Sequence, residues 1–118
     1  MALVLVADDS LFQRMVLSRV ARAAGADVAE AKDGEECLAL ARERRPKVVV
    51  LDLNMPGLDG FGVLKALRDE GLLGQVVVIT ADIQKSTEAR CFELGAALVL
   101  HKPVDEAVLR ERIEDLLA

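Results

Sequence analysis

The chain has 118 residues, of which 53% are hydrophobic and 30% are charged, and its formal net charge at pH 7 is −5. This length suits a single hydrophobic core, and the composition is that of a globular domain rather than of a disordered segment. An acidic chain with three Phe and no Trp or Tyr lacks the basic face and stacking aromatics of nucleic-acid-binding proteins, so we expect no direct binding to nucleic acid.

The sequence indicates a protein that neither enters a membrane nor is secreted. No apolar run approaches the roughly 20 residues of a membrane-spanning helix, and no basic segment precedes the first apolar run. Met1 leads directly into a strand-like segment, so we expect a cytoplasmic protein without a leader. Cys37 and Cys91 stand outside any C-x-x-C pair, and we expect two free thiols that are buried or half-buried.

Strand-like and helix-like segments alternate five times along the chain. Apolar runs predict the strands, and apolar residues at helical spacing predict the helices. In chain order we expect a strand at 2–7, a helix at 11–24, a strand at 27–31, a helix at 34–45, a strand at 48–52, a helix at 58–69, a strand at 75–80, a helix at 83–94, a strand at 96–100 and a helix at 104–117. Ser10 is a good N-cap for the first helix, and Pro46 ends the second.

Apolar patterns also predict which of these elements are most buried. The strand at 48–52 begins with an unbroken apolar run, which is typical of a strand covered on both faces, so we expect it at the centre of a sheet. The strand at 27–31 alternates in polarity and is expected at an edge. In the first helix, apolar residues recur at helical spacing and predict one apolar face, formed by Phe12, Met15, Val16 and Val20.

The strict alternation of strands and helices predicts an α/β fold over residues 1–118. Strands that are separated by helices form a parallel sheet with right-handed crossovers, and helices then cover both faces of that sheet. The sequence contains no linker, internal repeat or low-complexity tract. We therefore expect one domain and no second one.

Polar side chains follow the predicted strands at the points where they end. These residues are Asp8 and Asp9, Asp52 with Asn54, Thr80 with Ala81, and Lys102. Because all strands of a parallel sheet end at the same edge, and open α/β sheets bind ligands at that edge, we expect these residues to meet in space. The sequence thus predicts three carboxylates, a hydroxyl and an ammonium in one pocket.

This set of side chains predicts phosphoryl transfer to a carboxylate. Three clustered carboxylates repel one another, and oxygen ligands of this kind suit Mg²⁺. A carboxylate that lies between a metal and the ammonium of Lys102 can accept a phosphoryl group. Thr80 would then donate a hydrogen bond to a phosphoryl oxygen.

Four separated motifs resemble the response regulator receiver domain of two-component signalling, in the order expected for that family. They are Ala7-Asp8-Asp9-Ser10, Leu51-Asp52-Leu53-Asn54-Met55-Pro56-Gly57-Leu58-Asp59-Gly60, Thr80-Ala81 and Lys102-Pro103. The resemblance spans the whole chain and is closest to stand-alone, chemotaxis-type receivers. It implies a flavodoxin-like doubly wound fold with strand order 2-1-3-4-5, for which the chemotaxis receiver is a standard example.

The resemblance also implies a role for each site residue. Asp52 matches the phosphoacceptor, Asp9 the direct Mg²⁺ ligand, and Asp8 the acid that acts largely through metal-bound water. The backbone carbonyl of Asn54 would complete the Mg²⁺ shell, and Asn54 and Ala81 would present backbone groups at the phosphate site. Thr80 matches the switch hydroxyl and Lys102 the phosphate-binding ammonium, and the Lys102-Pro103 bond matches one that is cis in the family.

One position departs from the family pattern. Where the family usually has Tyr or Phe, three residues before the lysine, this chain has Val99. A β-branched side chain has few rotamers and little reach, so we expect the loop at 81–84 and the helix that follows it to carry the switch instead. Asp82, two residues beyond Thr80, is a candidate for orienting a water molecule in phosphate hydrolysis.

These observations predict a phosphorylation-controlled interaction module rather than an enzyme with a separate substrate. It would accept phosphate from a histidine kinase or phosphotransfer protein, and bind a downstream protein through the fourth helix, fifth strand and fifth helix. The alternative is a Mg²⁺-dependent phosphatase or phosphotransferase that uses Asp52 on a small substrate. Asn54 disfavours it, because the comparable enzymes need an acid there to protonate the leaving group.

Overall fold

The computed structural model describes all 118 residues, Met1–Ala118. Strands and helices alternate five times, as predicted. They are β1 (Leu3–Ala7), α1 (Leu11–Ala23), β2 (Asp27–Ala31), α2 (Gly34–Arg44), β3 (Val48–Asp52), α3 (Gly60–Asp69), β4 (Gln75–Thr80), α4 (Lys85–Glu93), β5 (Leu98–His101) and α5 (Glu106–Leu117). None of the five helices combines the length and the apolar character needed to cross a membrane.

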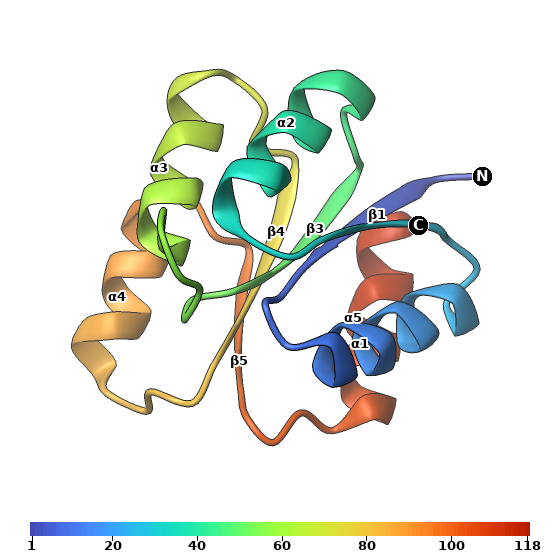
Figure 1. Ribbon diagram of the computed structural model, residues 1–118. Helices are drawn as coiled ribbons and strands as arrows, with labels where there is room; N and C mark the ends of the chain where they lie inside the picture. The colour runs from blue at the N-terminus through green and yellow to red at the C-terminus, as the bar shows by residue number, and fades with distance from the viewer.

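The five strands form one parallel sheet in the order β2-β1-β3-β4-β5 (Figure 1). β3 lies at the centre between β1 and β4, and β2 lies at an edge, as the apolar patterns predict. The chain order reverses direction at β1 and β3, which is the arrangement of the flavodoxin-like doubly wound fold. The predicted fold class is therefore confirmed.

Helices cover both faces of the sheet: α1 and α5 lie on one face, and α2, α3 and α4 lie on the other (Figure 1). Successive side chains of a strand point to opposite faces, so β3 contributes to two cores. Val48 and Val50 pack under α1 and α5, whereas Val49 and Leu51 pack under α2, α3 and α4. This double burial explains why β3 is apolar up to Asp52 and holds that residue rigidly at the edge of the sheet.

Three helices begin later than their apolar patterns predict. α3 begins at Gly60 because Asp59 is its N-cap and accepts a hydrogen bond from the Gly62 N–H. In the same way, α5 begins at Glu106 because Asp105 caps it. α4 begins at Lys85, after a loop that Asp82 organises. In α3 and α5 a short acidic side chain thus binds free N–H groups and sets the start of the helix. The N-cap of α4, Gln84, makes no such side-chain bond, and Asp82 instead accepts from the Gln84 N–H.

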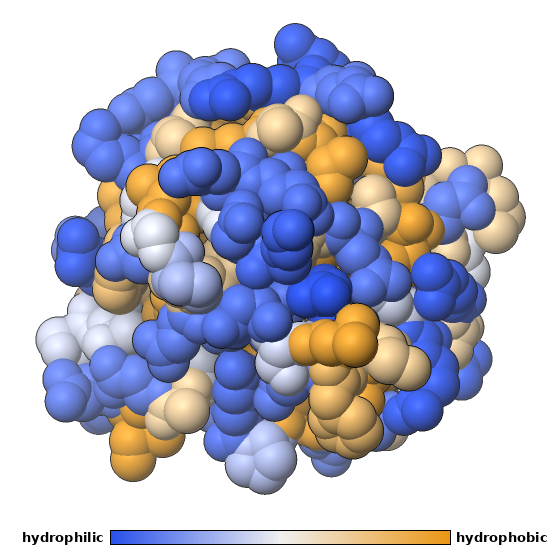
Figure 2. Space-filling model, viewed as in Figure 1, coloured by the Kyte–Doolittle hydropathy of each residue, from blue (hydrophilic) through white to orange (hydrophobic).

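The predicted apolar face of α1 is buried only over its C-terminal part. Phe12 and Met15 are 76% and 59% exposed, and Figure 2 shows hydrophobic surface over the start of α1. The residues of α1 that are buried against the sheet are Leu17, Val20 and Ala21, with Ser18 beside them. The helix begins beyond the end of β1, so its first turns have no strand beneath them to cover their apolar side chains.

Close packing at Gly60 shapes the segment that follows Asp52. A Cβ atom at Gly60 would lie 2.5 Å from the Cα of Leu53 and 3.1 Å from the carbonyl oxygen of Asp52. The Gly60 N–H donates to the Leu53 carbonyl oxygen at 3.1 Å. Glycine therefore lets the start of α3 contact the backbone at the end of β3, which holds the loop between Asp52 and α3 in place.

Candidate functional site

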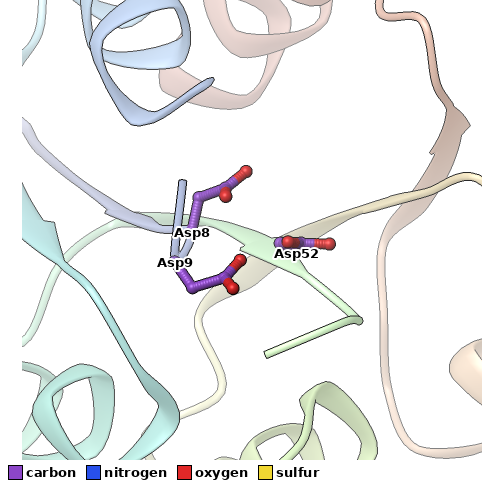
Figure 3. A group of neighbouring side chains, drawn as sticks. All are labelled: Asp8, Asp9 and Asp52. Carbon is purple, nitrogen blue, oxygen red and sulfur yellow. The ribbon is translucent and has the colours of Figure 1, made fainter. Parts of the chain in front are cut away.

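The predicted site residues meet at the carboxyl edge of the sheet. Asp8 and Asp9 follow β1, Asp52 ends β3, Thr80 ends β4 and Lys102 follows β5. Figure 3 shows the side chains of the three aspartates next to one another. Their nearest carboxylate oxygens all lie within 4.8 Å of one another. The register of the parallel strands thus brings together residues from the beginning, middle and end of the chain.

Asp52 is buried and lies at the centre of the group. Its Oδ1 atom accepts a hydrogen bond from the Lys102 Nζ at 3.2 Å and another from the Asn54 backbone N–H at 3.1 Å. The Lys102 backbone N–H donates to the carbonyl oxygen of Thr80 at 2.8 Å, and the Lys102-Pro103 peptide bond is cis. Asp52 therefore has a cation on one side and the carboxylates of Asp8 and Asp9 on the other.

Asp8 is buried, and one of its oxygens has no partner. Its N–H donates to the Ala31 carbonyl oxygen at 3.0 Å, and its Oδ1 accepts from the Ser10 N–H at 2.9 Å. Its Oδ2 is buried and accepts no hydrogen bond. Burial raises the pKa of Asp8, the negative charge of Asp52 adds to the effect, and the bond from Ser10 opposes it.

In the presence of a chelator of divalent ions, we expect the free energy of unfolding of Asp8→Asn to increase relative to that of the wild type as pH rises. The folded state binds the Asp8 proton more tightly than the unfolded state, so ionisation of Asp8 costs stability above its ordinary pKa of 3.8. The wild type should lose this contribution as pH rises from that value through the raised pKa of Asp8. Urea unfolding of both proteins over a pH series measures it, and a pH-independent difference would contradict the expectation.

Thr80 is linked to α4 through Asp82. The buried Thr80 Oγ1 accepts a hydrogen bond from the Asp82 N–H at 3.0 Å. The Asp82 carboxylate accepts from the Thr87 hydroxyl at 2.6 Å and from the Gln84 N–H at 2.9 Å. These two bonds, the one from Thr87 first, lower the pKa of Asp82. Both Asp82 oxygens are therefore engaged at the start of α4, and its role in orienting water stays a prediction.

A cleft of about 470 Å³ adjoins the site between the loops that follow β3 and β4. Polar side chains of the site and of both loops line one part of it, and Met55, Pro56 and Phe61 line another. Asp9, Asn54 and Thr80 are among its lining residues, so the cleft reaches the acidic group. The cleft therefore connects the acidic group with solvent.

The donor atoms of this pocket fit a small, hard divalent cation. The three carboxylates have oxygens within 4.8 Å of one another, and carboxylate oxygens are ligands that Mg²⁺ prefers. The Asp8 Oδ2 is a buried oxygen that lacks a partner, and such an atom is expensive to leave without a hydrogen bond or a cation. The single contacting ammonium of Lys102 balances only part of the negative charge.

Two features of the site were not anticipated from the sequence. Arg14, in the first turns of α1, donates from Nη1 to the Asp8 carbonyl oxygen at 2.7 Å. Thr87 holds Asp82, as described above. The remaining predicted residue, Ala81, lies exposed directly after Thr80. Neither Arg14 nor Thr87 stands at a strand end, so the rule that located the other residues could not point to them.

Comparisons with known proteins agree with this geometry. The profile of the response regulator receiver domain family matches residues 4–114. The chain is 34% identical to the protein PilH of Pseudomonas aeruginosa, over 100% of this chain and 99% of PilH. It resembles the structure of the chemotaxis protein CheY4 of Vibrio cholerae with a TM-score of 0.91 and 31% identity, covering 98% of both chains.

Other relatives are longer than this chain. It is 39% identical to the probable transcriptional regulator ycf27 of Porphyridium aerugineum over 97% of this chain, but it spans only 47% of that protein. Family membership favours a signalling module over the small-substrate phosphatase that the sequence left as an alternative. From the profile match, the strand order and the two full-length resemblances, the chain belongs to the family of response regulator receiver domains, which receive the phosphoryl signal in two-component systems.

Proposed function

We propose that Asp52 is the phosphoacceptor of this receiver domain and that Asp8, Asp9, Asp52 and the Asn54 carbonyl hold Mg²⁺. The observation that carries this proposal is the position of the buried Asp52 carboxylate, between two other carboxylates and the Lys102 ammonium at 3.2 Å. When bound, Mg²⁺ supplies positive charge that offsets the charge of the phosphoryl oxygens.

Residues of this chain perform the other steps of the proposed phosphoryl transfer. A carboxylate oxygen of Asp52 forms a bond to phosphorus while the phosphorus–nitrogen bond of a phosphohistidine breaks, and the imidazole leaves with the electron pair of that bond. Lys102 leaves its ion pair with Asp52 to neutralise a phosphoryl oxygen. The Thr80 hydroxyl donates a hydrogen bond to another phosphoryl oxygen, and the Ala81 backbone N–H donates a hydrogen bond to the same group.

The proposed donor is a histidine kinase or a phosphotransfer protein. The domain would catalyse only its own phosphorylation and hydrolysis, and its output would be the binding of a downstream protein through α4, β5 and α5. Partly exposed apolar and charged side chains on α4 and α5, including Phe92 and Val108, are available for such contacts.

The test is incubation with Mg²⁺ and a small-molecule phosphodonor such as phosphoramidate, followed by intact-mass measurement. We expect the mass to rise by one phosphoryl group with Mg²⁺ and to stay unchanged when EDTA replaces Mg²⁺. A protein that gains no mass with Mg²⁺, or gains it equally in EDTA, would contradict the proposed chemistry.

We also expect the start of α4 to respond when the site is filled. If Thr80 turns toward a phosphoryl group, its Oγ1 loses the bond from the Asp82 N–H, and Asp82 in turn holds Thr87. This chain of hydrogen bonds can carry the signal without the aromatic side chain that Val99 replaces.

Amide exchange with and without the phosphoryl mimic beryllofluoride measures this response. Protection should change at residues 81–87 in the wild type, and the change at α4 should shrink in Thr87→Val, which lacks the hydroxyl. Changes confined to the loop after Asp52 would contradict a pathway through α4.

A further inference from the structure

Arg14 makes contacts that are unusual for an arginine in the first turns of a surface helix. Its side chain is only 14% exposed, and its Nη1 donates to the Asp8 carbonyl oxygen at 2.7 Å. Its Nε donates to the Glu30 Oε1 at 3.3 Å, in the edge strand β2. The guanidinium therefore links the backbone just after β1 to a side chain of the neighbouring strand β2.

The bond from Arg14 completes the anchoring of Asp8. The Asp8 N–H is bound to Ala31, its Oδ1 to Ser10 and its carbonyl oxygen to Arg14. The Oδ2 is the one polar atom of Asp8 without a partner, and Asp8 belongs to the three-carboxylate group. The surrounding hydrogen bonds thus fix the residue and leave the oxygen that can bind a cation free.

The same bond also orients Asp9. The Asp8 carbonyl oxygen belongs to the planar peptide unit that ends at the Cα of Asp9, so holding that oxygen sets the direction in which Asp9 leaves β1. Asp9 is exposed, and no hydrogen bond from another side chain fixes the position of its carboxylate. Its approach to Asp52 therefore depends on the backbone before it.

We propose that Arg14 is a positioning residue of the divalent-cation site: by fixing the Asp8–Asp9 peptide, it directs the carboxylates of Asp8 and Asp9 toward Asp52. The inference rests on the proposed function of these carboxylates as Mg²⁺ ligands. Groups that orient metal ligands without touching the metal contribute strongly to affinity, and their loss typically weakens binding about 10- to 100-fold.

The charge of Arg14 makes the proposal distinguishable from simple electrostatics. A guanidinium near the pocket repels a cation, so removing it would tighten Mg²⁺ binding if charge were its only influence. Glu30 lies against the guanidinium and offsets much of its charge. If Arg14 positions the ligands, removing it weakens binding instead. The two roles therefore predict opposite signs.

The experiment compares Mg²⁺ affinities of Arg14→Met and Arg22→Met by titration calorimetry. Arg22 is the matched control, because its Nη2 also approaches Glu30, with 3.9 Å to Oε2, and its side chain is 60% exposed. The hydrogen bond to the Asp8 carbonyl oxygen comes from Arg14 and not from Arg22. We expect binding to Arg14→Met to be at least about 10-fold weaker than to the wild type. Binding to Arg22→Met should be unchanged or slightly tighter.

Thermal unfolding in EDTA gives the temperature range in which each variant is fully folded. The titrations are made within that range, so a loss of stability alone leaves the Mg²⁺ affinity unchanged, whereas a loss of positioning lowers it. Arg14→Met with wild-type or tighter Mg²⁺ binding would overturn the inference. A wild type that binds no Mg²⁺ would instead overturn the proposed metal site, and the inference with it.

A second variant carries the test if Arg14→Met does not fold. Arg14→Lys keeps the positive charge but lacks the planar fork that lets the guanidinium bind the Glu30 carboxylate and the Asp8 carbonyl oxygen together. We expect weaker Mg²⁺ binding than in the wild type, whereas an effect of charge alone predicts no change. Wild-type Mg²⁺ affinity in Arg14→Lys would overturn the inference.

Discussion

Asp52→Asn is expected to abolish the uptake of a phosphoryl group completely. The amide has nearly the shape of the carboxylate but carries no negative charge, and a neutral amide is a poor nucleophile toward phosphorus. Asp52 is the buried carboxylate that lies between the two other acids and Lys102, so no neighbouring group occupies its position. Intact mass after incubation with Mg²⁺ and phosphoramidate measures the result.

Asp59→Asn is the matched control for this variant. Asp59 lines the same cleft as the site, but its carboxylate caps α3 through the Gly62 N–H at 2.9 Å. Asn is an equally good N-cap, so the fold should persist and the phosphoryl group should still be taken up. Uptake by Asp52→Asn at the wild-type level would place the phosphoacceptor elsewhere in the chain.

Lys102→Met is expected to destabilise the protein by about 2–3 kcal/mol in EDTA. The substitution leaves the buried Asp52 carboxylate beside Asp8 and Asp9 without its ion-pair partner. Breaking a fully buried pair costs about 3–5 kcal/mol, and we expect less here because the Lys102 side chain is 21% exposed. Urea unfolding in EDTA measures the loss.

Mg²⁺ should recover part of that loss. A bound cation supplies the positive charge that Lys102 no longer provides, so Mg²⁺ should stabilise Lys102→Met more than it stabilises the wild type. Lys65→Met is the control, because the Lys65–Asp69 pair is exposed on α3 and its loss should cost far less stability than the loss of Lys102. The proposed pairing of Asp52 with Lys102 and Mg²⁺ would be contradicted if both variants lost the same free energy of unfolding. It would also be contradicted if Mg²⁺ did not reduce the difference in stability between Lys102→Met and the wild type.

The fold and the gathering of the site residues could be predicted from the sequence for a simple physical reason. The apolar run before Asp52 requires burial on both faces, and only a central strand of a covered parallel sheet provides that. Once the strands are parallel, their ends share one edge, which brings Asp8, Asp9, Thr80 and Lys102 to Asp52. Neither step needs side-chain detail.

Helix faces were predicted less well. The spacing of Phe12 and Met15 correctly places them on one side of α1, but spacing does not reveal how far the sheet extends beneath a helix. The core-facing residues begin at Leu17, and the first turns extend beyond the strands. Similarly, the starts of α3 and α5 depend on the hydrogen bonds of Asp59 and Asp105, which lie within apolar or mixed segments.

The sequence by itself determined the α/β fold, the central position of β3 and the acidic pocket at the ends of the strands. Only the tertiary structure decided how that pocket is held: Arg14 on the carbonyl of Asp8, and Thr87 on Asp82 beside Thr80. Periodicity and strand order fix where backbones run, because burial acts on whole faces of an element. A hydrogen bond to one carbonyl or one carboxylate depends on distances of a few tenths of an ångström, and these are set only when the elements have packed.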